Sequence, residues 1–418
     1  MKRIAGLAAL ALILAAGVAH AEEAASAGGH GAPAAEAPAE AGAAALPAAP
    51  LDPKWTRTRT PMPFDVMRSV QFLQDQVARG NDRAIRVQAL LLRRFGRTFI
   101  EADPAVWQDP RNFRAAILFT LSGGSPEVLD RLSREKLFDE AQTPLVDAAR
   151  AYARNDLAVA SKGLNALDLD GLEPVLAAQI SLVMGQIAQV DHPADAVPHL
   201  DRARLLAPGT LIEEAALRLE AMLVDGLGQH EIADRLARQY FDRYAASSYA
   251  ANFEARFGAI FAARADADPA KALASMADVI AGLPDPRQAR LFLAVGRRSL
   301  VQGNLVFANQ ASARALALSG LPDADRARGG LYEIASRLGT SDPQAARAGL
   351  DGLDRSLLHP EDAKLLDAAY SVLGSIDAPV ETASVEVAPT AVPSAPSVLA
   401  RAEQAIAGAS QDLKQSQP

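Results

Sequence analysis

Histidines are the residues of this chain best suited to metal or acid–base chemistry, and they are few. Of the six, only His192, His199, His230 and His359 lie beyond the first fifty residues. His192 and His199 are about two helical turns apart and could face the same way, but no third ligand accompanies them. Zinc sites need three or four protein ligands, and the chain contains no cysteine. We therefore expect neither a metal nor a cofactor.

The serines and the acidic pairs fit structural roles better than catalytic ones. The chain lacks a G-x-S-x-G motif, and the stretch SGGS at residues 122–125 is followed by Pro126 and Glu127, where a phosphate-binding loop would need Lys and then Ser or Thr. It is better explained as the end of one helix and the cap of the next. Acidic pairs such as Asp266 with Asp268 lie at expected turns, where aspartate caps helices. These patterns predict a protein that is not an enzyme.

Arginines and one tryptophan are the remaining candidates for function. Arg93, Arg94 and Arg97 surround Phe95 and form the densest basic cluster beyond the first residues. Two interpretations stand: a solvated helix face with Phe95 turned inward, or an electrostatic contact surface for an acidic partner. Trp107 lies downstream in an acidic loop bounded by two prolines, where it could cover the next helix. We predict Arg93, Arg94, Arg97 and Trp107 as partner-binding residues.

The first residues predict export. Two basic residues precede an apolar run from Ile4 to Val18, which is too short to span a bilayer comfortably, and the small residues that follow match an A-x-A cleavage site. We predict cleavage between Ala21 and Glu22, with a retained signal anchor as the alternative. Without cysteine the mature chain has neither disulfides nor a lipidated cysteine. We therefore expect a soluble periplasmic protein with no transmembrane segment after cleavage.

Charge is unevenly distributed along the chain. Without the predicted signal peptide there are 40 basic and 50 acidic residues, a net charge of −10, which argues against nucleic acid as a partner. Residues 54–114 nevertheless carry +6, which leaves −16 for the rest of the mature chain. The two ends therefore offer different surfaces to protein partners.

Apolar periodicity predicts two N-terminal helices and a short buried helix after them. The inner face of the first would carry Val66, Val70, Leu73 and Val77. The inner face of the second would carry Ile85, Leu92, Phe95 and Phe99. Pro110 is placed to open the third helix, and Gly123 with Gly124 is placed to end it. The apolar face of this third helix would carry Phe113, Ile117 and Leu121.

Polar breaks return at an even spacing through the rest of the chain. They are Asn155, Asp191, Gln229, Asp268, Asn304 and Ser341. Their separations of 36 to 39 residues fall between those typical of tetratricopeptide and HEAT-type helix pairs. Alanine and leucine dominate, and no segment shows sustained strand alternation. We predict an all-α solenoid of helical hairpins, a degenerate tetratricopeptide-like array, because most consensus positions of that repeat are missing.

These features divide the chain into six segments. They are a signal peptide (1–21), an Ala/Pro-rich flexible tether (22–62), a basic N-terminal helical region (63–130), the helical-repeat array (131–377), a Pro-rich linker (378–396) and a tail (397–418). A thin apolar seam from Leu399 to Leu413 leaves two interpretations for the tail, a docking helix or an Ala-rich segment that stays mostly unfolded.

Two strings resemble a known family. They are MRSVQFLQDQVARGND at residues 67–82 and the stretch at residues 103–129 with its core DPRNFRAAILFTLSGG. Both are similar to the periplasmic motility family MotC, also labelled chemotaxis protein MotC. The resemblance implies a non-enzymatic periplasmic protein needed for flagellar rotation. The implied partner is the periplasmic part of the proton-driven stator subunit MotB.

Two other classes of function remain as alternatives. The long curved surface of a solenoid that has no recognisable catalytic residues also suits a general envelope scaffold, which would act in secretion or cell-wall assembly. An enzyme is the third class, because helical solenoids occur in periplasmic cell-wall lyases. Those enzymes append a separate catalytic domain, and the roughly forty residues after Ser375 are too few to form one.

Overall fold

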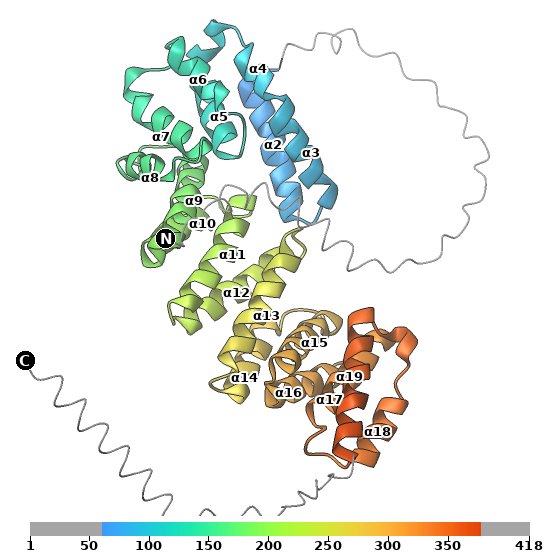
Figure 1. Ribbon diagram of the computed structural model, residues 1–418. Helices are drawn as coiled ribbons and strands as arrows, with labels where there is room; N and C mark the ends of the chain where they lie inside the picture. The colour runs from blue at the N-terminus through green and yellow to red at the C-terminus, as the bar shows by residue number, and fades with distance from the viewer. Residues whose placement is uncertain (1–60, 378–418) are drawn as a thin grey trace, which may run out of the picture. The chain divides into compact units, whose positions relative to one another are not determined.

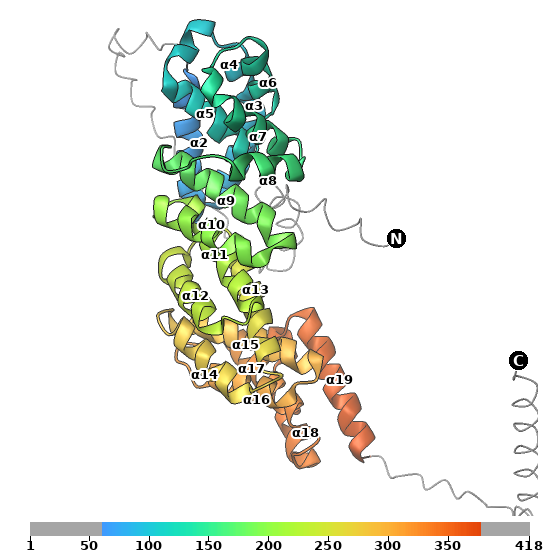
Figure 2. The same cartoon turned by 90° about the vertical axis from the view of Figure 1, so that its left-hand side faces the viewer.

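The computed structural model describes residues 61–377 (Figures 1 and 2). Within that range the chain is helical and contains no strand, so the predicted all-α class is confirmed. The predicted signal peptide, the Pro-rich linker, the tail and nearly all of the tether lie outside the described residues. The chain divides into two units, Met1–Tyr370 and Ser371–Pro418, and the packing described below belongs to the first.

The helices follow one another with short connections. The N-terminal elements are α2 (Pro63–Ala78), α3 (Asp82–Arg94), α4 (Gly96–Ile100), the 3-10 helix η3 (Pro104–Gln108), α5 (Pro110–Leu121) and α6 (Glu127–Arg134). The central elements are η4 (Glu140–Gln142), α7 (Thr143–Ala153), α8 (Leu157–Asn165), α9 (Pro174–Asp191), α10 (Pro193–Leu206), α11 (Leu211–Gly226), α12 (His230–Tyr244) and α13 (Ala250–Arg264). The last elements are α14 (Pro269–Ile280), α15 (Asp285–Gln302), α16 (Leu305–Leu316), α17 (Asp323–Ser336), α18 (Pro343–Asp351), η5 (Arg355–Leu357) and α19 (Pro360–Asp377).

Consecutive helices pair as hairpins, and each predicted polar break falls at the junction inside a hairpin. Asn155 separates α7 from α8, Asp191 ends α9, and Ser341 lies between α17 and α18. The other three breaks are the N-cap residues of α12, α14 and α16. Each hairpin packs on the next, as α10 does on α11 and α16 on α17. The repeat of 36 to 39 residues is therefore a repeat of stacked hairpins, and the predicted solenoid is confirmed.

Local sequence explains where many of these helices begin. Asp109, Asp156, Asp268, Asn304 and Asp342 are N-caps whose side-chain oxygens accept a backbone N–H from the first turn of the following helix. Three of these helices, α5, α14 and α18, begin with proline, whose fixed φ suits the first helical position. The polar breaks thus start the second helix of a hairpin as well as ending the first.

Helix α5 is the most enclosed element of the N-terminal half. Its three expected apolar-face residues are buried, but so are most others: nine of its twelve residues are buried, because α2, α6, α7 and α9 all pack against it. The ring of Phe119 stacks on that of Phe99, with centroids 4.5 Å apart. The buried cluster around α5 runs from Val66 to Met184, so the basic N-terminal helices and the first hairpins of the array share one core.

The hairpin of α2 and α3 also contacts a part of the array that is distant in the chain. Besides packing on α5 and α11, it reaches the turn between α12 and α13. There the backbone N–H of Ser248 donates to the carbonyl of Val77 at 3.1 Å. Gly80 has φ +94°, and a Cβ at this position would lie 2.3 Å from the carbonyl oxygen of Ala246. Glycine at position 80 therefore allows both the turn and the close contact.

The second N-terminal helix differs from its prediction in two ways. It was expected to continue past Phe95, but α3 ends at Arg94 and a short helix α4 begins at Gly96. Glycine is a poor residue for a helix interior, which explains the break at this point. The residues of α3 buried in the fold are Ala84 and Gln88, whereas the expected inner residue Ile85 is only partly buried.

The start of α19 is tied to the preceding hairpins by a buried carboxylate. Asp362 is 3% exposed, and its Oδ1 accepts hydrogen bonds from Arg297 Nε at 2.9 Å and from the Tyr332 hydroxyl at 2.7 Å. Arg328 pairs with its other oxygen at 3.2 Å. Because the partners come from α15 and α17, this network fixes the first turn of α19 on the last hairpins.

Candidate partner-binding surface

The residues considered for metal or acid–base chemistry are not brought together. His192 is exposed at the N-cap of α10, and His199 is half-buried in the same helix, where burial lowers its pKa. His230 Nδ1 lies 2.8 Å from Asp225 Oδ1. Between residues 61 and 377 no three His, Cys, Asp or Glu side chains are grouped so that they could hold a metal ion. No helix in the same range is long and apolar enough to cross a membrane.

The SGGS stretch and the acidic turns have the structural roles predicted for them. A Cβ on Gly124 would lie 2.3 Å from the ring of Phe119, so glycine lets the chain leave α5 close to its own side chains. Ser125 Oγ accepts a backbone N–H at the start of α6 at 3.3 Å. Asp268 caps α14. These residues therefore end and begin helices.

The predicted arginine cluster lies on the surface. Arg93 and Arg94 are in the last turn of α3, Arg97 is in α4, and all three are exposed. Arg97 Nε lies 3.7 Å from Glu101 Oε1, a contact between side chains that are 85% and 69% exposed. Such a pair adds little stability in water and leaves the guanidinium accessible. Phe95 packs against the core, as the interpretation of a solvated helix face expected, and the exposed arginines leave the contact with an acidic partner as a prediction.

Four further residues of α3 extend this surface and were not identified from the sequence. They are Arg83, Arg86, Val87 and Leu90, all exposed on α3. Together with Arg93 and Arg94 they recur at helical spacing and form one stripe, which we call the α3 stripe. The only acidic residue of α3, Asp82, lies in its first turn, where its negative charge interacts favourably with the positive end of the helix dipole. The missed signal was the periodicity of the arginines themselves.

Trp107 is not part of this surface, which corrects the prediction. It is 6% exposed and belongs to the same buried cluster as Phe113. Its segment is the 3-10 helix η3, held in place by Asn112, whose Nδ2 donates to the Val106 carbonyl at 2.8 Å and whose Oδ1 accepts from the Phe64 N–H at 3.0 Å. Trp107 thus covers α5, as its position between two prolines suggested, but it offers no face to a partner.

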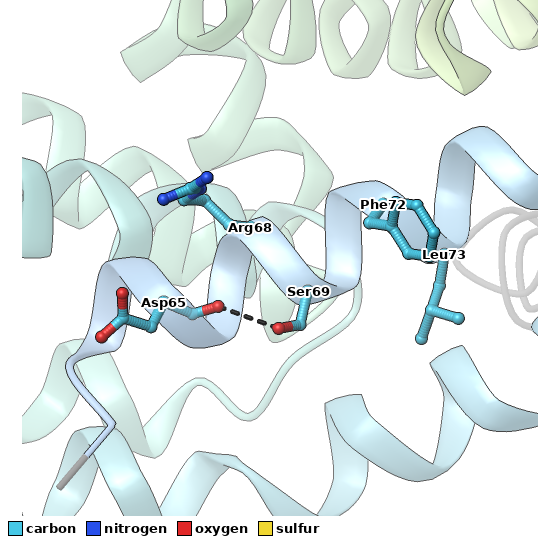
Figure 3. Close-up of a pocket in the computed structure, with 5 residues that line it drawn as sticks. All are labelled: Asp65, Arg68, Ser69, Phe72 and Leu73. Atoms are coloured by element: carbon cyan, nitrogen blue, oxygen red, sulfur yellow. Dashed lines mark hydrogen bonds between the residues drawn. The ribbon is translucent and has the colours of Figure 1, made fainter. Parts of the chain in front are cut away.

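A shallow open depression lies on α2. The described residues that line it are Asp65, Arg68, Ser69, Phe72 and Leu73, and Figure 3 shows them along successive turns of the helix. Phe72 is 62% exposed, an unusual state for an aromatic side chain. Both helices of the N-terminal hairpin therefore carry exposed arginine and exposed apolar side chains.

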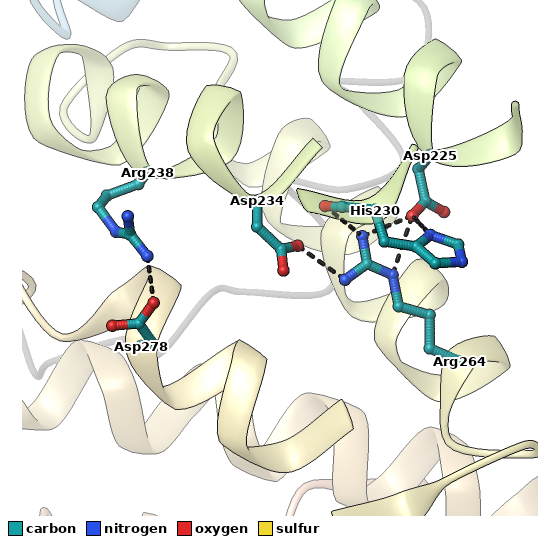
Figure 4. Close-up of polar contacts among 6 residues, drawn as sticks. All are labelled: Asp225, His230, Asp234, Arg238, Arg264 and Asp278. Atoms are coloured by element: carbon teal, nitrogen blue, oxygen red, sulfur yellow. Dashed lines mark hydrogen bonds and ion pairs between the residues drawn. The ribbon is translucent and has the colours of Figure 1, made fainter. Parts of the chain in front are cut away.

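Charges farther along the chain are paired with one another (Figure 4). Arg264 pairs with Asp225 at 2.5 Å and with Asp234 at 2.7 Å, and it is only 12% exposed. Arg238 pairs with Asp278. Because these side chains belong to α11, α12, α13 and α14, the pairs join neighbouring hairpins of the array.

Several carboxylates of α11 are buried outright. Glu214 is fully buried, accepts a hydrogen bond from the Tyr240 hydroxyl at 2.8 Å and lies 3.4 Å from Arg218 Nε. Glu220 is 2% exposed and accepts a hydrogen bond from Arg204 at 3.1 Å. Burial, reinforced by the nearby charge of Asp201, raises the pKa of Glu220 to about 7. These carboxylates therefore belong to the interior of the fold.

Comparison with known proteins identifies the family of this chain. The family described as chemotaxis protein MotC matches residues 1–417. The chain is also 30% identical over 336 residues to the chemotaxis protein MotC of Rhizobium meliloti (strain 1021), which covers 80% of this chain and 76% of that protein. The resemblance seen in the two N-terminal strings is thereby confirmed and extended over most of the sequence. This chain belongs to the MotC family of chemotaxis proteins.

Proposed function

We propose that this protein is a non-enzymatic periplasmic component of the flagellar motor that binds the periplasmic part of the stator subunit MotB and is needed for rotation. Membership of the MotC family gives it a role in motility. The periplasmic location rests on the signal-like N-terminal sequence. The specific partner rests on the family resemblance and on the surface described above.

The exposed arginines of α3 and α4 are the observation that favours protein binding. Arg93, Arg94 and Arg97 lie on a net basic region of an otherwise acidic chain. Such a patch attracts an acidic partner and orients it during encounter. Arginine also forms two parallel hydrogen bonds with a carboxylate, which gives the contact a defined geometry.

The test is cross-linking in intact cells that make a tagged copy, followed by mass spectrometry of its neighbours. We expect MotB among the products of the unmodified protein. We expect that product to disappear, together with swimming, in the variant Arg93→Glu/Arg94→Glu/Arg97→Glu.

The matched control is the variant Arg235→Glu/Arg290→Glu/Arg314→Glu, which changes the net charge equally at three exposed arginines of the array. It should keep both the cross-link and swimming. Recovery of secretion or cell-wall proteins instead of MotB, with swimming intact after deletion of the gene, would favour the general envelope scaffold. Clearing of peptidoglycan in a zymogram would contradict the non-enzymatic role.

A further inference from the structure

The α3 stripe has the spacing of one half of a two-helix contact. Val87 and Leu90 are three residues apart, and Arg83 and Arg94 lie four residues before and after them, so the four follow the 4-3-4 spacing of a heptad seam. Arg86 and Arg93 are seven residues apart and occupy the same flanking position beside that seam. All six side chains face away from the buried residues of α3.

The arginines of the stripe have no acidic partner in the described fold. Arg83, Arg86 and Arg94 form no ion pair between residues 61 and 377, and Arg93 only donates from Nε to the carbonyl of Ala89 at 3.2 Å. Some arginines farther along the chain are paired instead, as when Arg150 and Arg154 both contact Asp130. Within residues 61–377 no carboxylate occupies the guanidinium groups of the stripe, so they can bind carboxylates of a partner.

The two apolar residues at the centre of the stripe are incompletely covered. Val87 is 43% exposed and Leu90 is 40% exposed. The pattern of a β-branched residue followed three positions later by leucine is the one preferred at the seam of a parallel two-helix contact. Two half-covered aliphatic side chains are too small an apolar area to insert into a lipid surface, which favours a protein partner.

The stripe is held on a rigid base. Figure 1 shows α2 between α3 and α5, and α2 is fixed near both ends. At its start the N–H of Phe64 donates to Asn112 Oδ1, and at its end the carbonyl of Val77 accepts from the N–H of Ser248. A preformed surface binds with a smaller entropic cost than one that must first order itself.

We propose that the α3 stripe docks a single α-helix of the partner, one that carries apolar residues at a spacing of three and four and acidic residues beside them. The apolar residues cover Val87 and Leu90, and the acidic residues pair with Arg86 and Arg93 on the flank and with Arg83 and Arg94 at the ends. With MotB as the partner this inference rests on the proposed function, but the docking mode does not depend on that identity.

The test places a photo-reactive amino acid at Val87 or at Leu90 of the full chain in living cells. Val159 and Val306, exposed aliphatic positions on the array, are the controls. We expect protein adducts at positions 87 and 90 whose linked peptide is acidic and has apolar residues at a spacing of three and four. These adducts should fall at least tenfold in Arg86→Glu/Arg93→Glu.

A lipid adduct, a basic or neutral peptide, or a yield no greater than at the control positions would overturn the docking mode. An acidic helical peptide from a protein other than MotB would support the docking mode and contradict the proposed partner. A MotB adduct found at the control positions alone would leave the proposed partner standing and overturn the α3 stripe as its binding site.

Discussion

The α3 stripe and the α11 to α13 segment use the same residue types in opposite ways. In the segment, Glu214 and Arg218 are buried together, and Arg264 lies between Asp225 and Asp234. On the stripe, arginines are exposed on a helix that contains one acidic residue. A buried charge without an oppositely charged partner destabilises the fold, whereas an exposed charge is solvated by water and remains available to bind another molecule. Substitutions of charged residues should therefore affect folding in the α11 to α13 segment and binding on the α3 stripe.

The largest expected effect on stability is that of Arg218→Ala. It leaves the carboxylate of Glu214 buried without its cation, which costs about 3–5 kcal/mol in the free energy of unfolding. Denaturant unfolding of the purified mature chain measures this loss. Arg94→Ala, the matched change on the α3 stripe, should cost less than about 0.5 kcal/mol. Equal losses for the two variants would remove the distinction between the regions.

The next largest effect is that of Gly80→Ala, which strains a left-handed residue and places a Cβ 2.3 Å from the Ala246 carbonyl. We expect the free energy of unfolding to fall by about 2–3 kcal/mol, because the backbone is strained and the Ala246 carbonyl must move away from the new Cβ. Gly209→Ala separates the two causes, because its φ is +80° but no atom lies within 4 Å. Hydrogen exchange should quicken in α2 and at Ser248 in the first variant alone. Unchanged exchange there would show that the hairpin does not depend on this contact.

The pH dependence of stability should come partly from Glu220. Burial and Asp201 raise its pKa to about 7 in the folded state, above the value of the unfolded chain. The folded state then holds a proton that the unfolded state has lost, so stability falls as pH rises through the interval between the two pKa values. We expect the titration of Glu220 to lower the free energy of unfolding by about 2 kcal/mol between pH 5 and pH 7. Glu220→Gln should flatten the profile, and an unchanged slope would exclude Glu220 as its source.

The smallest expected effect on stability is that of Arg93→Glu/Arg94→Glu/Arg97→Glu. These side chains are exposed and make at most one solvated ion pair, so the free energy of unfolding should change by less than about 1 kcal/mol. Thermal unfolding and circular dichroism check this directly. A large loss of stability would mean that the cluster supports the fold, and a loss of swimming in this variant would then say nothing about binding.

Features set by neighbouring residues could be predicted from the sequence. Prolines and capping side chains, such as Pro110 and Asp268, act within one turn, so the helix starts and the hairpin period followed from local chemistry. The outward face of Arg93 and Arg94 followed from the inward Phe95 in the same way. Periodicity over one helix was enough for these features.

Features set by residues far apart in the chain could not be predicted. Burial of Trp107 depends on Asn112 joining η3 to the start of α2. The close approach of Gly80 to the carbonyl of Ala246 depends on a turn between two much later helices. The enclosure of α5 on all sides depends on four separate helices, so a single apolar face was too simple a description.

The most direct measurement is calorimetric titration of the purified mature chain with the purified periplasmic part of MotB at low and high salt. We predict binding that weakens as salt is raised, because the contact depends on exposed charges. Binding should be lost in Arg93→Glu/Arg94→Glu/Arg97→Glu and kept in Arg235→Glu/Arg290→Glu/Arg314→Glu. Equal binding by the two variants, or no binding by the unmodified chain, would contradict the assignment of this surface to MotB.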